Sequence, residues 1–237
     1  MQVPIHDVTL TETVAYVQQW ISSGGAYQIA TVNPEFLVRA RQHADFRAAL
    51  QRAALCIPDG IGVVWAARLR GQPLRERVAG SDLVPQLSQR AAELGWRVFY
   101  LGAAPGVAEQ AAARLQERSP ALQIAGCFAG SPAPEEADAI IERIRSSRAN
   151  LLFVAYGAPK QDLWLSRNLA ATGATVGIGV GGSFDFVAGV ARRAPRWVQR
   201  AGLEWAYRLM REPRRWRRQL ALPLFAALVL LRLDNPR

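Results

Sequence analysis

One acidic side chain stands at a place in the sequence where an α/β protein would meet its substrate. Asp59 follows an apolar run that predicts a buried strand, and Gly60 comes directly after it. A carboxylate at the end of such a strand can act as a general base that takes a proton from an incoming hydroxyl group. Because Asp-Gly is also a frequent turn sequence, Asp59 is either a catalytic base or a turn residue.

Arg77 is the second residue whose type could do chemistry. It lies in a loop-like stretch before Ser81 and Asp82, which could cap the start of a helix. A fixed guanidinium group stabilises the charge that grows on a departing diphosphate through paired hydrogen bonds. The alternative for Arg77 is a surface salt bridge with Glu76 or Asp82.

Polar residues near other predicted strand ends could bind a substrate. Thr31 and Asn33 carry a hydroxyl and an amide group that could form hydrogen bonds with a polar substrate. Asn33 precedes Pro34, so its side chain could equally hold the loop as an Asx turn. Gln161 follows a loop and could either face the site or simply begin a helix.

Three further candidates flank glycine-containing loops. Lys160 is the only lysine of the chain and is either a substrate contact or a solvated charge. Gly181 belongs to the stretch 179–185, whose glycines allow the backbone to approach a ligand closely. Asp185 ends that stretch and could bind a ribose or brace the loop.

Six short apolar runs indicate the elements that must position these residues. Each is bounded by Gly, Pro or polar residues, as in strands covered on both faces. The runs are 28–32, 54–57, 97–101, 122–126, 151–155 and 175–180, and the helical patterns between them are 106–118, 134–147 and 161–171. The alternation predicts an α/β fold with a doubly wound, mostly parallel, Rossmann-like sheet. Ligands bind beyond the carboxyl ends of the strands in such sheets, where the candidate residues fall.

The charge is concentrated at the C-terminal end. Residues 192–237 hold twelve Arg against three acidic residues, although the whole chain carries a net charge of only +10. The apolar run 220–231 would span about 18 Å as a helix, against about 30 Å for a bilayer core. We therefore expect an α/β catalytic domain over 1–191 and a basic, apolar, membrane-associating helical appendage over 192–237. The alternative is an apolar helix docked on the body or on another subunit.

Several classes of protein are disfavoured by what the sequence lacks. Cys56 and Cys127 are not in a CxxC pair, and His6 and His43 stand alone, so we expect neither a disulfide framework nor a metal site. No GxGxxG fingerprint follows the strand at 97–101, and no DxD pair occurs, so we expect no cofactor. The first seven residues have no secretory signal pattern, so we expect catalysis in the cytosol.

An ordered series of short motifs carries a family resemblance. The motifs are TVNPE at 31–35, PDG at 58–60, ERVAGSD at 76–82, GAPKQ at 157–161, GGSFDFVAG at 181–189, RAPRW at 193–197, GLEWAYRL at 202–209 and EPRR at 212–215. The series resembles the WecG/TagA/CpsF family of glycosyltransferases (glycosyltransferase family 26). The resemblance implies inverting transfer of an N-acetylmannosamine-type sugar from a UDP-sugar donor. The implied acceptor is N-acetylglucosamine on undecaprenyl diphosphate, in the biosynthesis of a cell-surface polysaccharide.

The resemblance also implies roles for single residues. It assigns the base to Asp59 and the diphosphate contact to Arg77, and it places the tail arginines Arg208, Arg215 and Arg218 near the diphosphates. These arginines would either close over the site or only anchor the chain to an anionic membrane surface. We accordingly expect a peripheral enzyme on the inner face of the cell membrane, capable of self-association and without a nucleic-acid partner.

Two other functions remain as alternatives at this point. A Rossmann-type oxidoreductase using a nucleotide cofactor would share the fold, but it lacks its fingerprint here. A nucleic-acid-binding protein would explain the basic tail with its tryptophans, but it does not require the apolar segment that follows. Binding of NAD, or salt-dependent binding of duplex DNA, would distinguish these alternatives from a sugar transferase.

Overall fold

The computed structural model describes residues 2–211, 213, 216 and 220–231. Within them one sheet of six strands forms the centre of the molecule, in the order β2-β1-β6-β5-β3-β4. All neighbouring strands are parallel. The strands are β1 (Tyr27–Val32), β2 (Leu55–Pro58), β3 (Arg97–Gly102), β4 (Gln123–Phe128), β5 (Leu151–Ala155) and β6 (Val176–Gly179). The predicted α/β fold with a parallel, Rossmann-like sheet is confirmed.

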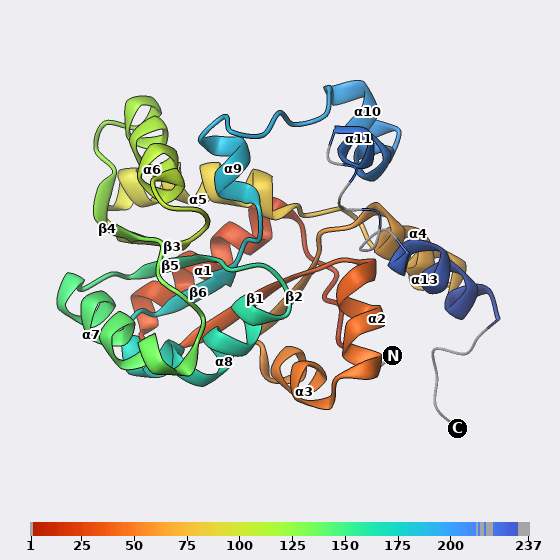
Figure 1. Cartoon of the computed structure of the whole chain (residues 1–237), viewed down its shortest axis with the longest axis horizontal. Helices are drawn as coiled ribbons and strands as arrows, with labels where there is room; N and C mark the ends of the chain where they lie inside the picture. The colour runs from red at the N-terminus through yellow and green to blue at the C-terminus, as the bar shows by residue number, and fades with distance from the viewer. Residues whose placement is uncertain (1, 212, 214–215, 217–219, 232–237) are drawn as a thin grey trace.

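Helices cover both faces of the sheet (Figure 1). One face packs against α1 (Leu10–Ser23), α5 (Gly80–Leu94), α6 (Val107–Arg118) and α9 (Ser183–Val187). The other packs against α2 (Pro34–Gln42), α3 (Ala44–Arg52), α7 (Ala137–Ser147) and α8 (Lys160–Thr172). Successive strand residues serve opposite faces, as Ile29 and Ala30 show by belonging to different core clusters. Continuous apolar runs are the result, because both faces of each strand need apolar side chains.

The predicted helices are present with small changes at their ends. The patterns at 106–118 and 161–171 correspond to α6 and α8. The pattern at 134–147 begins as a 3₁₀ turn, Pro134–Glu136, before α7 continues it. A proline and two glutamates at a helix start thus form a tighter first turn than the sequence pattern indicates.

Helix α8 lies unusually close to the strand beneath it. A Cβ atom built on Gly177 of β6 would lie 2.6 Å from a methyl carbon of Leu165. One built on Gly179 would lie 2.6 Å from Gln161 Nε2. The glycines of β6 therefore let α8 bring the residues at its N-terminal end close to the end of the sheet.

The C-terminal part forms α10 (Arg196–Arg200), α11 (Glu204–Arg211) and α13 (Ala221–Leu230). Helix α13 packs on α2 and on α4 (Ile61–Leu69), and its Phe225 and Val229 are buried there. Leu224 and Leu230 of the same helix are exposed. The apolar run at 220–231 is therefore docked on the body by one side while the other faces outward.

None of the helices formed by the described residues is both long and apolar enough to cross a membrane. The division at residue 191 stays a prediction.

Candidate active site

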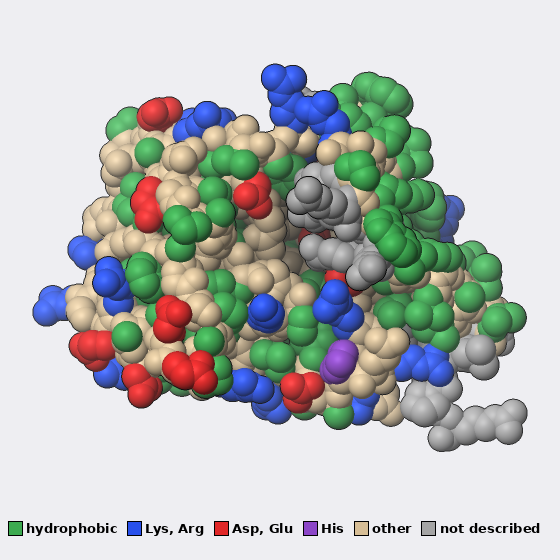
Figure 2. Space-filling model, viewed as in Figure 1, with side chains coloured by type: hydrophobic (Ala, Val, Ile, Leu, Met, Phe, Trp, Pro, Cys, Tyr) green, Lys and Arg blue, Asp and Glu red, His purple; other side chains and the backbone are tan. Residues whose placement is uncertain are grey.

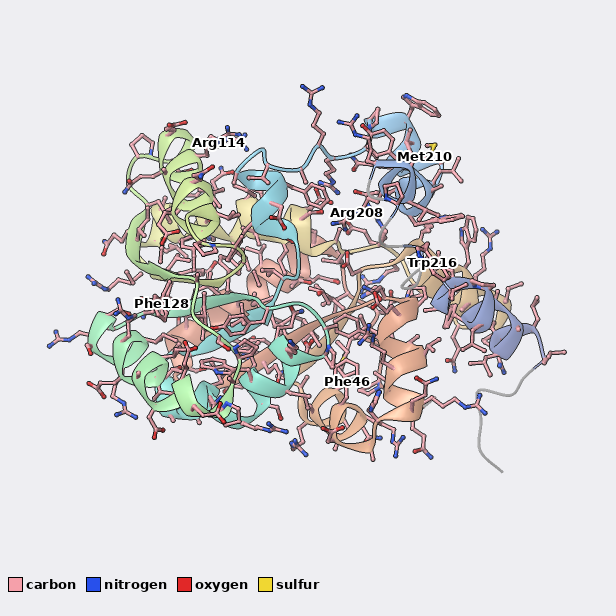
Figure 3. The ribbon with its side chains drawn as sticks, in the orientation of Figure 1. Phe46, Arg114, Phe128, Arg208, Met210 and Trp216 are labelled. Atoms are coloured by element: carbon pink, nitrogen blue, oxygen red, sulfur yellow. The ribbon has the colours of Figure 1, made fainter. Side chains whose placement is uncertain are left out.

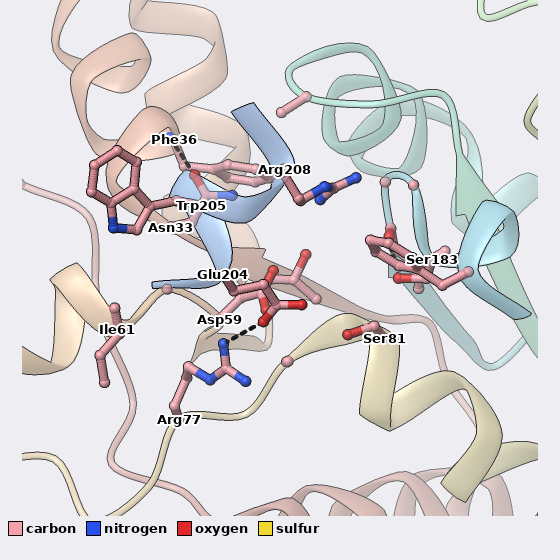
Figure 4. A pocket seen from close by; sticks show the side chains of 18 of the residues that line it. Asn33, Phe36, Asp59, Ile61, Arg77, Ser81, Ser183, Glu204, Trp205 and Arg208 are labelled. Carbon is pink, nitrogen blue, oxygen red and sulfur yellow. Dashed lines mark hydrogen bonds and ion pairs between the residues drawn. The ribbon is translucent and has the colours of Figure 1, made fainter. Parts of the chain in front are cut away.

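A pocket opens beyond the carboxyl ends of β1, β2, β5 and β6. Its volume is about 240 Å³. The residues that follow these strands form one wall, and residues 77–81 form a second. Helix α11, from the C-terminal part of the chain, forms another wall of the pocket with Glu204, Trp205 and Arg208 (Figure 4). Segments from both ends of the chain thus meet at the edge of the sheet where the fold predicts a ligand.

Most of the residues singled out in the sequence line this pocket. They are Thr31, Asn33, Asp59, Arg77, Gln161, Gly181 and Arg208. Lys160 is exposed and lines a neighbouring cavity beside Trp164, and Asp185 is not among the residues that line the pocket. Arg215 and Arg218 lie outside the described residues. The roles assigned to all of these residues remain predictions.

Asp59 is held at the pocket by contacts with two other segments. It follows the last residue of β2, and its backbone N–H donates to the carbonyl oxygen of Val32 at 2.9 Å. Its Oδ1 accepts a hydrogen bond from the backbone N–H of Gly80 at 3.3 Å. Burial raises the pKa of Asp59 to about 6, and the charge of Arg77 acts in the opposite direction. The carboxylate is therefore mostly ionised at pH 7, and its pKa is close enough to pH 7 for it to accept a proton.

The contact with Gly80 also corrects the predicted start of α5. The sequence places a cap at Ser81 and Asp82, but the helix begins at Gly80 and its N-cap, Ala79, makes no side-chain hydrogen bond. The carboxylate of Asp59, 21 residues earlier, accepts from a free N–H of the first turn instead. A negative charge at this end of a helix is favourable, so the helix stabilises Asp59 while Asp59 caps the helix.

Arg77 forms an ion pair that its neighbours in sequence do not suggest. Its Nη1 donates to Oε2 of Glu204 at 3.1 Å, and both side chains are largely shielded from solvent. The two partners expected from the sequence bind elsewhere, since Glu76 accepts from the backbone of Leu10 and Asp82 pairs with Arg193. The simple local salt bridge considered for Arg77 is therefore wrong.

Thr31 and Asn33 each use one side-chain atom to hold the pocket wall. Thr31 Oγ1 donates to the carbonyl oxygen of Gly179 at 2.8 Å and so links β1 to β6. Asn33 Oδ1 accepts from the backbone N–H of Phe36 at 3.2 Å and caps α2. The local structural role considered for Asn33 is therefore real, as a helix N-cap, and its side chain lines the pocket at the same time.

Gln161 joins two loops of the pocket. Its side chain is buried, and its Oε1 accepts from the backbone N–H of Gly157 at 3.1 Å and from that of Gly181 at 2.9 Å. These glycines follow β5 and β6, so Gln161 fixes the relative position of the two strand ends. It also lies in the first turn of α8, so the helix-start alternative and the pocket position are both correct.

Sequence reasoning did not single out Glu204 or Phe186 as functional residues, yet both line the pocket. The guanidinium carbon of Arg208 lies 4.6 Å from the centroid of the Phe186 ring, a cation–π distance. The spacing of Glu204 and Arg208 is a signal that could have found the first of them, because residues four apart lie on one face of a helix. No group of three or more His, Cys, Asp or Glu residues suited to a metal ion occurs in the described part of the chain.

Comparison with known proteins decides the family. The whole chain, residues 1–237, matches the model of the Glycosyl transferase WecG/TagA/CpsF family. The chain belongs to this family. It is therefore a glycosyltransferase, and the resemblance seen in its ordered motifs is confirmed.

Two curated relatives are similar to this chain over nearly their whole length. Both are named N-acetylglucosaminyldiphosphoundecaprenol N-acetyl-beta-D-mannosaminyltransferase. The protein from Bacillus spizizenii is 35% identical over 230 residues, which cover 97% of this chain and 89% of the relative. The protein from Bacillus subtilis is 33% identical over 236 residues, which cover 99% and 91%. Neither the oxidoreductase nor the nucleic-acid-binding alternative gains support from these matches.

Proposed function

We propose that this glycosyltransferase moves an N-acetylmannosamine-type sugar from a UDP donor to N-acetylglucosamine on undecaprenyl diphosphate, with inversion at the anomeric carbon. One observation carries the proposal: the carboxylate of Asp59 and the guanidinium groups of Arg77 and Arg208 line the same pocket. Sugar transfer from a nucleotide donor needs both, a base for the acceptor hydroxyl and positive charge for the departing diphosphate. The names of the two Bacillus relatives support the choice of sugar and acceptor.

The proposed reaction is a single displacement. Asp59 takes the proton of the acceptor hydroxyl while the hydroxyl oxygen forms a bond to the anomeric carbon of the donor sugar. The bond between that carbon and the diphosphate of UDP breaks, and the electron pair leaves with the diphosphate. Arg77 and Arg208 stabilise the charge that grows there, with hydrogen bonds to its oxygens. Attack from the side opposite the leaving group inverts the anomeric centre.

A lipid-linked acceptor would bring the enzyme to the inner face of the cell membrane, and we propose that it works there as a peripheral protein. Hydrophobic side chains gather over the end of the molecule where Figure 1 draws α4, α11 and α13, as Figure 2 shows. Exposed side chains there include Trp65, Leu69, Trp205, Met210, Leu224, Leu230 and Leu231. Helices α11 and α13 belong to the arginine-rich part of the sequence, residues 192–237, and a segment that combines apolar and cationic residues is typical of interfacial binding.

Turnover of a synthetic lipid-diphosphate N-acetylglucosamine with a panel of UDP-sugars tests this function. The assay uses the full chain with anionic vesicles, with and without EDTA, and follows UDP release and the anomeric configuration of the product. We expect a disaccharide of inverted configuration from UDP-N-acetylmannosamine, at a rate that EDTA does not change. Absence of transfer from every UDP-sugar would contradict the proposal, and abolition by EDTA would contradict the assignment of the diphosphate charge to arginines.

A further inference from the structure

A second acidic group on the pocket, beside Asp59, is not used by the proposed reaction. Glu204 is the first residue of α11, and its side chain is only 16% exposed. A carboxylate at a site for a diphosphate would repel the ligand unless other charges balance it. Its partners therefore indicate what it does.

Glu204 is shared between two arginines, one in the loop before α5 and the other in the segment before α10. Its Oε2 accepts from Arg77 Nη1 at 3.1 Å, and its Oε1 accepts from Arg193 Nε at 3.3 Å. Arg193 in turn pairs with both carboxylate oxygens of Asp82 in α5, at 2.8 Å for the Nη2–Oδ2 contact. A continuous chain of charges thus runs from α5 through Arg193 and Glu204 to the loop that carries Arg77. These ion pairs fix the first turn of α11 against the pocket.

The position of α11 also sets the position of Arg208. Glu204 and Arg208 are four residues apart and lie on the same face of the helix, and both line the pocket. Arg208 lies on the side of α11 that faces the body, whereas Met210 lies on the outer side and is 74% exposed (Figure 3). The Arg208 guanidinium reaches the Phe186 ring and the loop after β6, where a Cβ built on Gly182 would lie 3.3 Å from its Nη2.

We propose that Glu204 is a positioning residue for sugar transfer: by bridging Arg77 and Arg193 it holds α11 in place so that Arg208 faces the donor diphosphate. This inference rests on the proposed function of the same pocket. Arg208 is the group that acts on the substrate, and Glu204 acts through it. The short contacts of Glu204 are with protein cations, so its charge is already balanced when the donor enters.

A double-mutant cycle between the two residues tests the inference. The variants are Glu204→Gln, Arg208→Gln and the pair, assayed as full chains with the synthetic lipid acceptor and UDP-N-acetylmannosamine. Each single variant is expected to lower kcat about 10- to 100-fold while KM for the donor changes little, because a misplaced cation acts mainly in the transition state. The kcat of the double variant is expected to be no more than about threefold below that of the slower single variant, since both substitutions remove the same contribution, that of a correctly placed Arg208.

A matched control is Glu142→Gln, which removes an exposed ion pair with Arg145 on α7. Its activity is expected to stay within about twofold of the wild type. If Glu204→Gln does not fold by circular dichroism, Arg193→Gln removes the other side of the bridge and is expected to show the same non-additivity with Arg208→Gln.

The outcomes separate the two proposals. Multiplicative losses in the double variant would overturn the inference, because the two residues would then act independently. A Glu204→Gln variant as active as the wild type, or more active, would also overturn it. If the wild type transfers sugar, either of these two results overturns only the inference about Glu204 and leaves the proposed function in place. A wild-type chain that transfers no sugar overturns both proposals.

Discussion

At the scale of residues, the Asp59 carboxylate and the guanidinium groups of Arg77 and Arg208 line one pocket, and each is held by a different partner. Asp59 accepts from the first turn of α5, and Arg77 donates to Glu204. Arg208 is stacked on Phe186. Such fixed polar groups need little rearrangement when charge develops during a reaction, which is the basis of electrostatic catalysis.

Arg77 is predicted to contribute directly to binding of the nucleotide diphosphate. Arg77→Gln should weaken UDP affinity about 10- to 100-fold in titration calorimetry, since a hydrogen-bonded charge pair is worth about 1.5–3 kcal/mol. Arg75→Gln is the matched control, because Arg75 lies two residues away and makes exposed ion pairs with Asp7 and Glu12. Equal UDP affinity in Arg77→Gln and the wild type would remove Arg77 from the site.

Single residues also show how far the sequence can be interpreted. Asp59, Thr31 and Gln161 could be selected because each follows a predicted strand, and parallel strands bring their ends to one edge. Glu204 could not be selected in this way, because its ion pair with Arg77 joins positions 127 residues apart. No local pattern encodes which distant charge will face a given arginine.

At the scale of elements, the strands were easier to predict than the helices. Every strand except the edge strand β4 is buried almost throughout and so forms an uninterrupted apolar run. Helix α4, by contrast, has apolar residues around most of its circumference, including the exposed Trp65 and Leu69, so it shows little helical periodicity. The sequence misplaces the start of α5, because the first turn of this helix is capped by Asp59 rather than by a neighbouring residue.

Because α8 packs closely on β6, we expect that even one added methyl group on this strand destabilises the protein. Gly177→Ala would place a methyl group 2.6 Å from Leu165 and 2.8 Å from Leu169. We expect the free energy of unfolding to fall by about 1–3 kcal/mol, as for other overpacked cores. Urea denaturation monitored by circular dichroism measures it, and an unchanged midpoint would show that α8 can move away without cost.

Asp162 in the first turn of α8 predicts a pH-dependent stability. Its carboxylate is fully buried, and burial raises its pKa to about 7 although hydrogen bonding from the Gln161 side chain acts in the opposite direction. Between about pH 4 and pH 7 the folded state therefore binds more protons at this group than the unfolded state, and stability falls as pH rises. Asp162→Asn should gain stability relative to the wild type across this interval in urea denaturation. A difference that does not change with pH would contradict a buried, titrating carboxyl group.

At the scale of the whole molecule, a nearly neutral α/β body ends in a basic segment and a half-exposed apolar helix. Helix α13 buries Phe225 and Val229 against α2 and α4, so this helix is folded onto the body. We infer that the same face can meet a membrane that carries the lipid acceptor.

The exposed leucines of α13 provide the prediction at this scale. Leu224→Glu combined with Leu230→Glu should abolish sedimentation with anionic vesicles and leave the UDP affinity unchanged, because charged side chains are costly in the interface. Leu94→Glu changes a similarly exposed leucine at the end of α5 and should leave vesicle binding intact. Vesicle binding by the α13 double variant equal to that of the wild type would contradict a membrane-facing α13, and a change in oligomeric state instead would indicate that a second copy covers it.

The most direct test of the account is the measurement of sugar transfer and UDP binding by Asp59→Asn. This variant keeps the shape of the side chain and removes the base. We expect UDP affinity within about threefold of the wild type and a rate of transfer lower by about 10²- to 10⁴-fold, while kcat/KM of the wild type falls below about pH 6 as Asp59 gains a proton. A variant that transfers sugar at the wild-type rate would contradict the account.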